Sequence, residues 1–250
     1  MDAIEKIEQI NDDFVNSNGP FADVTFPEER LLEEIKIEED GETWALTMEE
    51  KLAAVSLFAT LDYNRDANQL VDKIVEAADH DTINIFNPHE MERSKKSVEY
   101  LFEEVSFRYP QRDAHAWHKN CSILVEQYNG KWHELLLSVG CDAPTFVKQL
   151  NNDDFNCLKG VKIAPMYARI INDEVCPMSN LWNLDIPVDT HIRQLSNKLA
   201  DGCLEDDDDI RAWWGVIGQQ ADIELHTVDG GLWMIGNNWD DWGEEYWDSL

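Results

Sequence analysis

Basic residues are scarce in this sequence: Lys and Arg number 20 against 51 Asp and Glu, and the net charge at pH 7 is −31. A chain this acidic repels phosphate as a whole, which argues against nucleic-acid partners unless the charge is unevenly spread. The sequence also lacks an apolar run near the roughly 18 residues that span a bilayer. Its acidic N-terminus lacks the basic and apolar regions of a signal peptide. We therefore expect a soluble, cytoplasmic protein.

Metal-binding and redox patterns are also missing. The five cysteines stand at least 15 residues apart, and none forms a C-x-x-C pair or an iron–sulfur run. The seven histidines offer no H-E-x-x-H arrangement. Isolated cysteines in a cytoplasmic chain are usually reduced core residues. The sequence therefore predicts neither a metal site nor a cofactor.

The apolar content is sufficient for a core, because 43% of the 250 residues are apolar and 10 are Trp. The charge is unevenly distributed: residues 91–170 hold 11 Lys and Arg and 10 Asp and Glu, whereas the other 170 residues hold 9 and 41. We expect this near-neutral segment to meet any phosphate partner. The basic side chains expected nearest to the phosphates are Arg108, Arg112, Lys159 and Arg169. Low lysine with abundant Asp and Glu resembles adaptation to multimolar salt, which indicates a halophilic source.

Apolar residues recur at helical spacing along almost the whole chain. Pro27 opens a helical segment that we expect to reach Ile37, and Thr47 with Glu50 forms a capping box for the next helix. Further helical segments are expected around residues 70–75, 98–105, 113–128, 131–139 and 143–150. Alternating β patterns are scarce, so the sequence predicts an all-α fold. The aromatic and acidic tail is expected to dock as a terminal segment.

The stretch of residues 155–199 contains two expected helix starts. Residues 158–161 form a turn into a helix that Pro165 can start, and the free N–H groups of such a start suit a phosphate. Asp189 is the expected N-cap of the second helix. Taken singly, Asp189 is a plain cap and Lys162 a surface lysine.

Together, these residues resemble the helix-hairpin-helix DNA glycosylase superfamily. Its hairpin reads L-P-G-V-G-x-K-x-A and is followed by V-D-T-H-I, which residues 188–192 match in full. The hairpin match is looser, because a gapless alignment puts Ala164 at the family's lysine, whereas a hairpin two residues shorter puts Lys162 there. We adopt the second register. The 27-residue gap between Lys162 and Asp189 and the missing four-cysteine loop resemble the archaeal 8-oxoguanine glycosylase branch.

Two further segments give softer matches. Residues 58–66 resemble the segment whose polar residue enters the gap left by a flipped base, and Asn64 takes that place unless it is an ordinary loop residue. Residues 228–233 resemble the late D-x-x-x-W element of the archaeal branch, although Trp233 also fits as a core residue. By this resemblance the DNA contacts are Asn64, Arg65, Lys159, Gly160 and Val161. The base pocket contains Asp229, Trp233 and Met166.

The resemblance implies an all-α, two-lobed helix-hairpin-helix DNA glycosylase fold with an interlobe cleft. It would cover residues 46–236, between an acidic segment at 1–45 and the tail at 237–250. The implied activity is base excision with AP lyase activity on damaged double-stranded DNA, with 8-oxoguanine as the first choice of base.

In that reaction Lys162 attacks the sugar C1′ as a Schiff-base nucleophile and Asp189 stabilises the sugar cation. We expect a monomer that needs no metal or cofactor. Two alternatives stay open. One is a monofunctional glycosylase for mismatched or alkylated bases that uses only Asp189, and the other is a non-catalytic helix-hairpin-helix DNA-binding protein.

Overall fold

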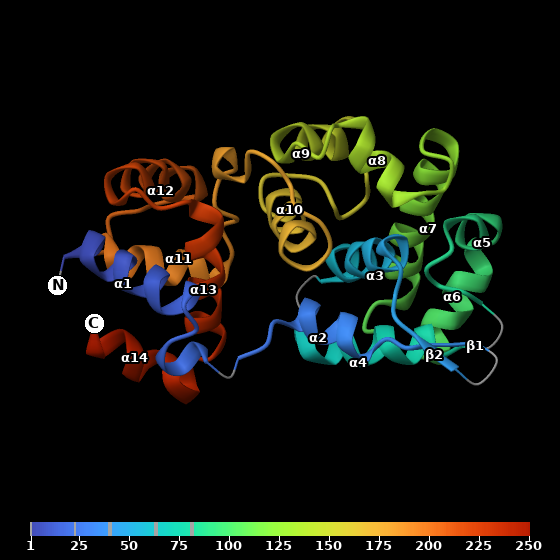
Figure 1. The fold of residues 1–250 in the computed structure, drawn as a ribbon, viewed down its shortest axis with the longest axis horizontal. Helices are drawn as coiled ribbons and strands as arrows, with labels where there is room; N and C mark the ends of the chain where they lie inside the picture. Colours follow the sequence, from blue (N-terminus) through green and yellow to red (C-terminus); the bar gives the residue numbers. More distant parts are fainter. Residues whose placement is uncertain (1, 23, 40–41, 63–64, 81–82) are drawn as a thin grey trace. The chain divides into compact units, whose positions relative to one another are not determined.

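The chain is helical in the computed structural model, which describes residues 2–22, 24–39, 42–62, 65–80 and 83–250 (Figure 1). The strands in these residues form one short antiparallel pair, β1 (Ile37–Glu39) and β2 (Glu42–Trp44), with Ile37 opposite Trp44. The expected all-α class is therefore confirmed. No helix in the described part of the chain is long and apolar enough to cross a membrane.

The helices form two compact units. The first unit contains Met1–Val24 and Asn180–Leu250, and the second contains Thr25–Ser179. The family resemblance instead implied divisions after residues 45 and 236. The N-terminal residues belong to the first unit because α1 (Ala3–Val15) packs against α13 (Leu225–Asn237). The composition and charge of individual segments cannot predict a contact between two helices as far apart in the sequence as α1 and α13.

Helix α13 is the centre of the first unit, where it contacts α1, α11 and α12. The elements of this unit are α1, η1 (Gly19–Phe21), η2 (Leu181–Asn183), α11 (Thr190–Leu199), α12 (Asp207–Ala221), α13, the π-helical turn η3 (Trp239–Gly243) and α14 (Glu244–Ser249). A Cβ on Gly231 would lie 3.2 Å from Ile10 and Phe14 of α1, and one on Gly236 would lie 2.4 Å from Cβ of His191 on α11. Glycine at these two positions therefore lets the helices approach closely.

The C-terminal tail docks on the N-terminal segment within the first unit. Phe21 packs edge to face against Trp242 and Tyr246, with ring centroids 5.5 and 5.4 Å away. The hydroxyl of Tyr246 donates to the Asp13 carboxylate at 2.8 Å. The expectation that the tail docks is confirmed, and the aromatic side chains account for it through edge-to-face contacts and buried area.

Helix α3 (Met48–Leu61) is the centre of the second unit. The other helices of this unit are α2 (Pro27–Glu34), α4 (Ala67–Ala78), α5 (Pro88–Arg93), α6 (Lys95–Glu104), α7 (Pro110–Gln127), α8 (Trp132–Ser138), α9 (Ala143–Asn152) and α10 (Ile163–Glu174). All side chains of residues 52–61 are buried, and α3 contacts α2, α4, α7, α8 and α10. A helix that is apolar all round requires neighbours on every side.

The start of α3 and the end of α2 can be compared with the helix boundaries expected from the sequence. The capping box is confirmed: the Thr47 backbone N–H donates to Glu50 Oε2 at 2.8 Å, and the Glu50 N–H donates to Thr47 Oγ1 at 3.3 Å. The expected helix from Pro27 to Ile37 is too long, since α2 ends at Glu34. Ile37 instead pairs with Trp44 in the strand pair, an interaction that local helical spacing does not predict.

A buried ion pair joins α2 to α10. Arg169 donates to Glu28 Oε1 at 3.2 Å, and it also lies 3.4 Å from Asp173. Arg169 was expected near phosphates, but it lies in the core because it neutralises the buried carboxylate of Glu28. Burial, together with Glu28 and other nearby carboxylates, raises the pKa of Glu174 to about 7.

We predict that Glu174→Gln changes the pH dependence of stability. The raised pKa means that the folded chain holds this proton more tightly, so the stability that Glu174 contributes is complete below its unfolded pKa near 4.5 and is lost as the pH rises through 7. Gln stays neutral at every pH. At pH 8 the variant should therefore be more stable by about 1–2 kcal/mol, a figure reduced for solvent screening of this half-buried group.

Urea unfolding at pH 4.5, 6 and 8 measures this effect. Glu33→Gln, at an exposed position on α2, is the control for the general gain from removing one negative charge. A stability difference between Glu174→Gln and the control that is the same at pH 4.5 and pH 8 would contradict the assignment.

Candidate functional site

Helices α9 and α10 pack together in the second unit and are joined by the loop of residues 153–162, which we call the hairpin. Asp142 caps the start of α9 by accepting the Thr145 N–H at 3.0 Å. Gly160 has a φ of +95°, a conformation that favours glycine. Its N–H donates to Asn151 Oδ1 at 2.9 Å, so the phosphate contact expected of this amide competes with an existing hydrogen bond.

The buried side chain of Asn120 on α7 fixes the position of the hairpin. Its Oδ1 accepts the Asn156 N–H at 2.6 Å, and its Nδ2 donates to the Asn156 carbonyl at 2.9 Å. The same Nδ2 donates to Thr60 Oγ1 on α3 at 3.1 Å. Asn120 thus satisfies the backbone N–H and carbonyl of Asn156 in the hairpin. Through Asn120 the hairpin is linked to α7 and α3, the two longest helices of the unit.

Basic side chains from α7 lie against the hairpin. Arg112 Nη2 lies 3.9 Å from the Cys157 sulfur. Lys119 donates to Asp154 at 2.5 Å, and Lys159 pairs with the same carboxylate. These two lysines lower the pKa of Asp154 to about 2. We call Arg112, Lys119, Lys159 and Lys162 the hairpin cluster; it brings four basic side chains near one loop of an acidic chain.

The two residues that could occupy the family's lysine position differ in exposure at the start of α10. Lys162 is exposed and precedes the first residue of the helix, whereas Ala164 is fully buried. Val161 is 61% exposed, and Met166 is half-buried in the first turn of α10. Helix α10 begins at Ile163, so Pro165 falls within its first turn rather than starting it, which that turn tolerates. Of the two alternatives, Lys162 carries the side chain that a ligand could meet.

Arg65, an expected DNA contact, lies in a buried ion pair. Its Nη2 donates to both carboxylate oxygens of Asp113 at 3.0 and 2.8 Å, and the side chain of Arg65 is 5% exposed. Burial raises the pKa of Asp113, while the hydrogen bonds from Arg65 oppose this rise. Asn64, the expected gap-filling residue, lies outside the described residues.

Three guanidinium groups gather around the ring of Tyr109. The guanidinium carbons of Arg65, Arg108 and Arg112 lie 5.4, 5.2 and 5.7 Å from the ring centroid. Each distance is within the range of a cation–π interaction. All three arginines were expected to face DNA, but Tyr109, which brings them together, was not; the pattern R-Y-P-Q-R at residues 108–112 is its sequence signal.

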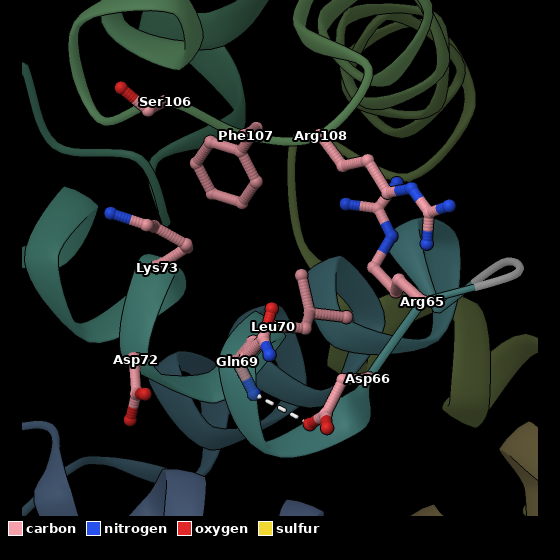
Figure 2. Close-up of a pocket in the computed structure, with 9 residues that line it drawn as sticks. All are labelled: Arg65, Asp66, Gln69, Leu70, Asp72, Lys73, Ser106, Phe107 and Arg108. Atoms are coloured by element: carbon pink, nitrogen blue, oxygen red, sulfur yellow. Dashed lines mark hydrogen bonds between the residues drawn. The ribbon is translucent and has the colours of Figure 1, made fainter.

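A pocket of about 420 Å³ adjoins this group, between α4 and the loop that joins α6 to α7 (Figure 2). Arg65 and Arg108 line one end, Lys73 lies at the other, and Leu70 and Phe107 lie between them. No local sequence pattern indicated this pocket, because its walls come from two segments about 35 residues apart.

The remaining expected site residues belong to the first unit. Asp189 is the N-cap of α11, as predicted, and its Oδ1 accepts the Ile192 N–H at 2.8 Å. Asp229 is buried in the middle of α13, and Trp233 follows one turn later and is half-buried. Helices α11 and α13 pack against each other, so these acids stand on neighbouring helices. The expected pairing of Asp189 with Lys162 of the second unit stays a prediction.

Comparison with known families finds no family model that matches the chain, and comparison with curated proteins finds no significant relative. The resemblance to DNA glycosylases therefore rests on the residues of this sequence. Among the residues that the structure describes, no three His, Cys, Asp or Glu side chains gather in a way that could hold a metal ion.

We predict that Asn120→Ala destabilises the protein by about 2–4 kcal/mol, because it leaves the Asn156 N–H and carbonyl without their buried partners. Urea unfolding measures the loss, and the Asn156 amide should exchange with deuterium faster. Asn151→Ala is the control: it also removes a hairpin hydrogen bond, but at an exposed position, where the loss should be about 1 kcal/mol or less. Equal stability of Asn120→Ala and the wild type would refute the role assigned to Asn120.

Proposed function

We propose that this protein is a DNA glycosylase with AP lyase activity, which removes a damaged base, in the first place 8-oxoguanine, from double-stranded DNA. The observation that carries the proposal is the exposed Lys162 at the start of α10, after the hairpin that follows α9, together with the V-D-T-H-I sequence whose Asp189 lies 27 residues further on. The motif and its spacing support an enzyme that acts on a nucleotide rather than a general acidic scaffold.

The charge distribution supports a phosphate partner. The chain has 20 basic residues, and four of them form the hairpin cluster. The Asp154 ion pairs with Lys119 and Lys159 are exposed, so each contributes little to stability. A DNA phosphate can replace Asp154 at small cost, and the cluster then serves to position the strand without reading its sequence.

The chemistry begins when the damaged nucleotide leaves the base stack, since C1′ is shielded inside a duplex. The neutral amine of Lys162 then attacks C1′; a nitrogen–carbon bond forms, the glycosidic bond breaks, and the base leaves with the electron pair and takes up a proton. The sugar ring then opens at the C1′–O4′ bond: O4′ takes up a proton, the nitrogen loses one, and a Schiff base forms at C1′. Loss of a C2′ proton and of the 3′ phosphate by β-elimination then cuts the strand.

Lys162 must lose its proton before it attacks, because an ammonium group has no free electron pair. The side chain is exposed on the second unit, so bound DNA has to supply the desolvation that favours the neutral amine. In the proposal, the Asp189 carboxylate stabilises the sugar cation and helps to deprotonate the amine.

The base-binding roles are assigned to α13 and α10. Asp229 is a buried acid that can accept a hydrogen bond from an N–H of an oxidised purine. Trp233 and Met166 supply half-buried apolar surface for stacking on the base. These assignments extend the motif resemblance to residues outside the hairpin.

A second candidate function is a non-catalytic DNA-binding module. The exposure of Lys162 favours it, because a solvated lysine suits a phosphate contact without further change. A monofunctional glycosylase that relies on Asp189 to activate water is the third possibility. Borohydride trapping on abasic DNA, together with base release from duplexes that contain a damaged or mismatched base, separates the three. An adduct supports the lyase, base release without an adduct supports the monofunctional enzyme, and neither supports the binding module.

We predict that Lys162→Gln abolishes both base release and the borohydride-trapped adduct, while stability stays within about 0.5 kcal/mol of the wild type. Loss of the amine removes the covalent route, whereas an exposed residue at a helix start contributes little to folding. Gel assays on an 8-oxoguanine duplex and on abasic DNA measure both activities. Lys159→Gln, at another exposed lysine of the same hairpin, should keep the adduct. Full adduct formation by Lys162→Gln would exclude this residue as the nucleophile.

We predict a different outcome for Asp189→Asn. An amide caps a helix almost as well as a carboxylate, so the fold should be kept. Base release should fall by about 100-fold or more because the charge that stabilises the sugar cation is lost, while slow trapping on pre-formed abasic DNA survives. Asp206→Asn, the matching N-cap substitution on α12, should leave both activities unchanged. An Asp189→Asn variant with wild-type base release would remove Asp189 from the mechanism.

A further inference from the structure

The pocket between α4 and the α6–α7 loop has the groups expected of a binding site for a small anion that carries a ring. Figure 2 shows the guanidinium groups of Arg65 and Arg108 side by side at one end. Leu70 and Phe107 form an apolar middle, and Lys73 reaches in from the other end. Its volume of about 420 Å³ lies in the range of small-molecule sites.

The arginine end is suited to an anion. The side chain of Arg65 is 5% exposed, and its Nε meets no hydrogen-bond acceptor among the described residues, although its Nη2 binds Asp113. A buried donor without an acceptor is costly, and an anion that enters the pocket would supply one. Tyr109 holds Arg108 beside Arg65 through its ring, so two guanidinium groups converge there.

The two carboxylates that line the pocket already have other partners. Asp66 caps α4 by accepting the Gln69 N–H at 3.0 Å, and Asp72 pairs with Arg30, which lies on α2 outside the pocket. Lys73 pairs with Glu76 at 2.7 Å, but this pair is exposed and therefore weak, so Lys73 can turn to a ligand. Arg65, Arg108 and Lys73 supply the positive charge of the lining.

We propose that this pocket binds a purine nucleoside monophosphate. The terminal phosphate lies at Arg65 and Arg108, which match its oxygens as fork-shaped donors. The purine packs against Leu70 and Phe107, and its ring acceptors meet the ammonium group of Lys73 and the side-chain amide of Gln69. Such a site is separate from the proposed catalytic hairpin and goes beyond the glycosylase activity.

The ligand has two sources with the same chemistry: a free nucleotide, or the phosphorylated 5′ end of a DNA strand. A terminal phosphate is favoured over a phosphate within a strand because two guanidinium groups converge on one position, where a dianion gains more than a monoanion. The short apolar middle, formed by Leu70 and Phe107, suits one ring rather than a continuous strand.

Isothermal titration of the full chain with GMP, guanosine and inorganic phosphate tests the proposal. GMP should bind at least ten times more tightly than either fragment, because each fragment lacks one half of the contacts.

Arg108→Gln should weaken GMP binding at least tenfold. Lys73→Gln should weaken GMP binding several-fold and leave phosphate binding unchanged. Arg93→Gln, at an exposed arginine outside the pocket, is the control. Arg65 is left intact because Asp113 would lose its buried partner.

Competition then identifies the source. Displacement of GMP by a 5′-phosphorylated oligonucleotide, and not by the same unphosphorylated strand, assigns the site to a strand end; no displacement by either assigns it to the free nucleotide. Equal displacement by both strands, guanosine binding as tight as GMP, no detectable GMP binding, or an Arg108→Gln variant equal to Arg93→Gln would each overturn the proposal. These titrations contain no damaged DNA, so their failure would leave the glycosylase proposal standing.

Discussion

The second unit depends on one requirement: the polar side chains that α7 buries must all find partners inside the protein. Asp113 binds Arg65 at the start of this helix, and Asn120 binds both backbone groups of Asn156 two turns later. A buried carboxylate or amide without such partners would cost more than any single apolar contact gains. By satisfying them, α7 sets the positions of the pocket wall and of the hairpin together.

The same helix concentrates positive charge. Its exposed face carries Arg112 and Lys119 toward the hairpin, and Tyr109, just before its first turn, holds Arg108 beside Arg65. In a chain with a net charge of −31, clustering is the way in which few basic residues can still meet a phosphate. At high salt, long-range attraction is screened, so contacts at hydrogen-bond distance matter more than net charge.

The two residues assigned to the proposed chemistry, Asp189 and Lys162, differ in whether they also have a structural role. Asp189 has a structural role already, because one of its oxygens caps α11. Lys162 has no such role, since no side-chain hydrogen bond caps the start of α10 in the described residues.

The sequence by itself determined the features that arise from neighbouring residues. Helical spacing predicted the all-α class, and the local signals at Thr47 and Asp189 predicted caps that the structure confirms. The turn at 158–161 predicted the hairpin between α9 and α10, because a turn and two helix ends need only local chain geometry.

Only the tertiary structure decided which distant segments meet. It ended α2 at Glu34 by pairing Ile37 with Trp44, grouped α1 with α13, and buried Arg65 and Arg169 against carboxylates 48 and 141 residues away. An arginine looks the same in a sequence whether it faces solvent or a buried acid. Its role is set by the partner that packing brings to it, and that partner is not encoded in the residues beside it.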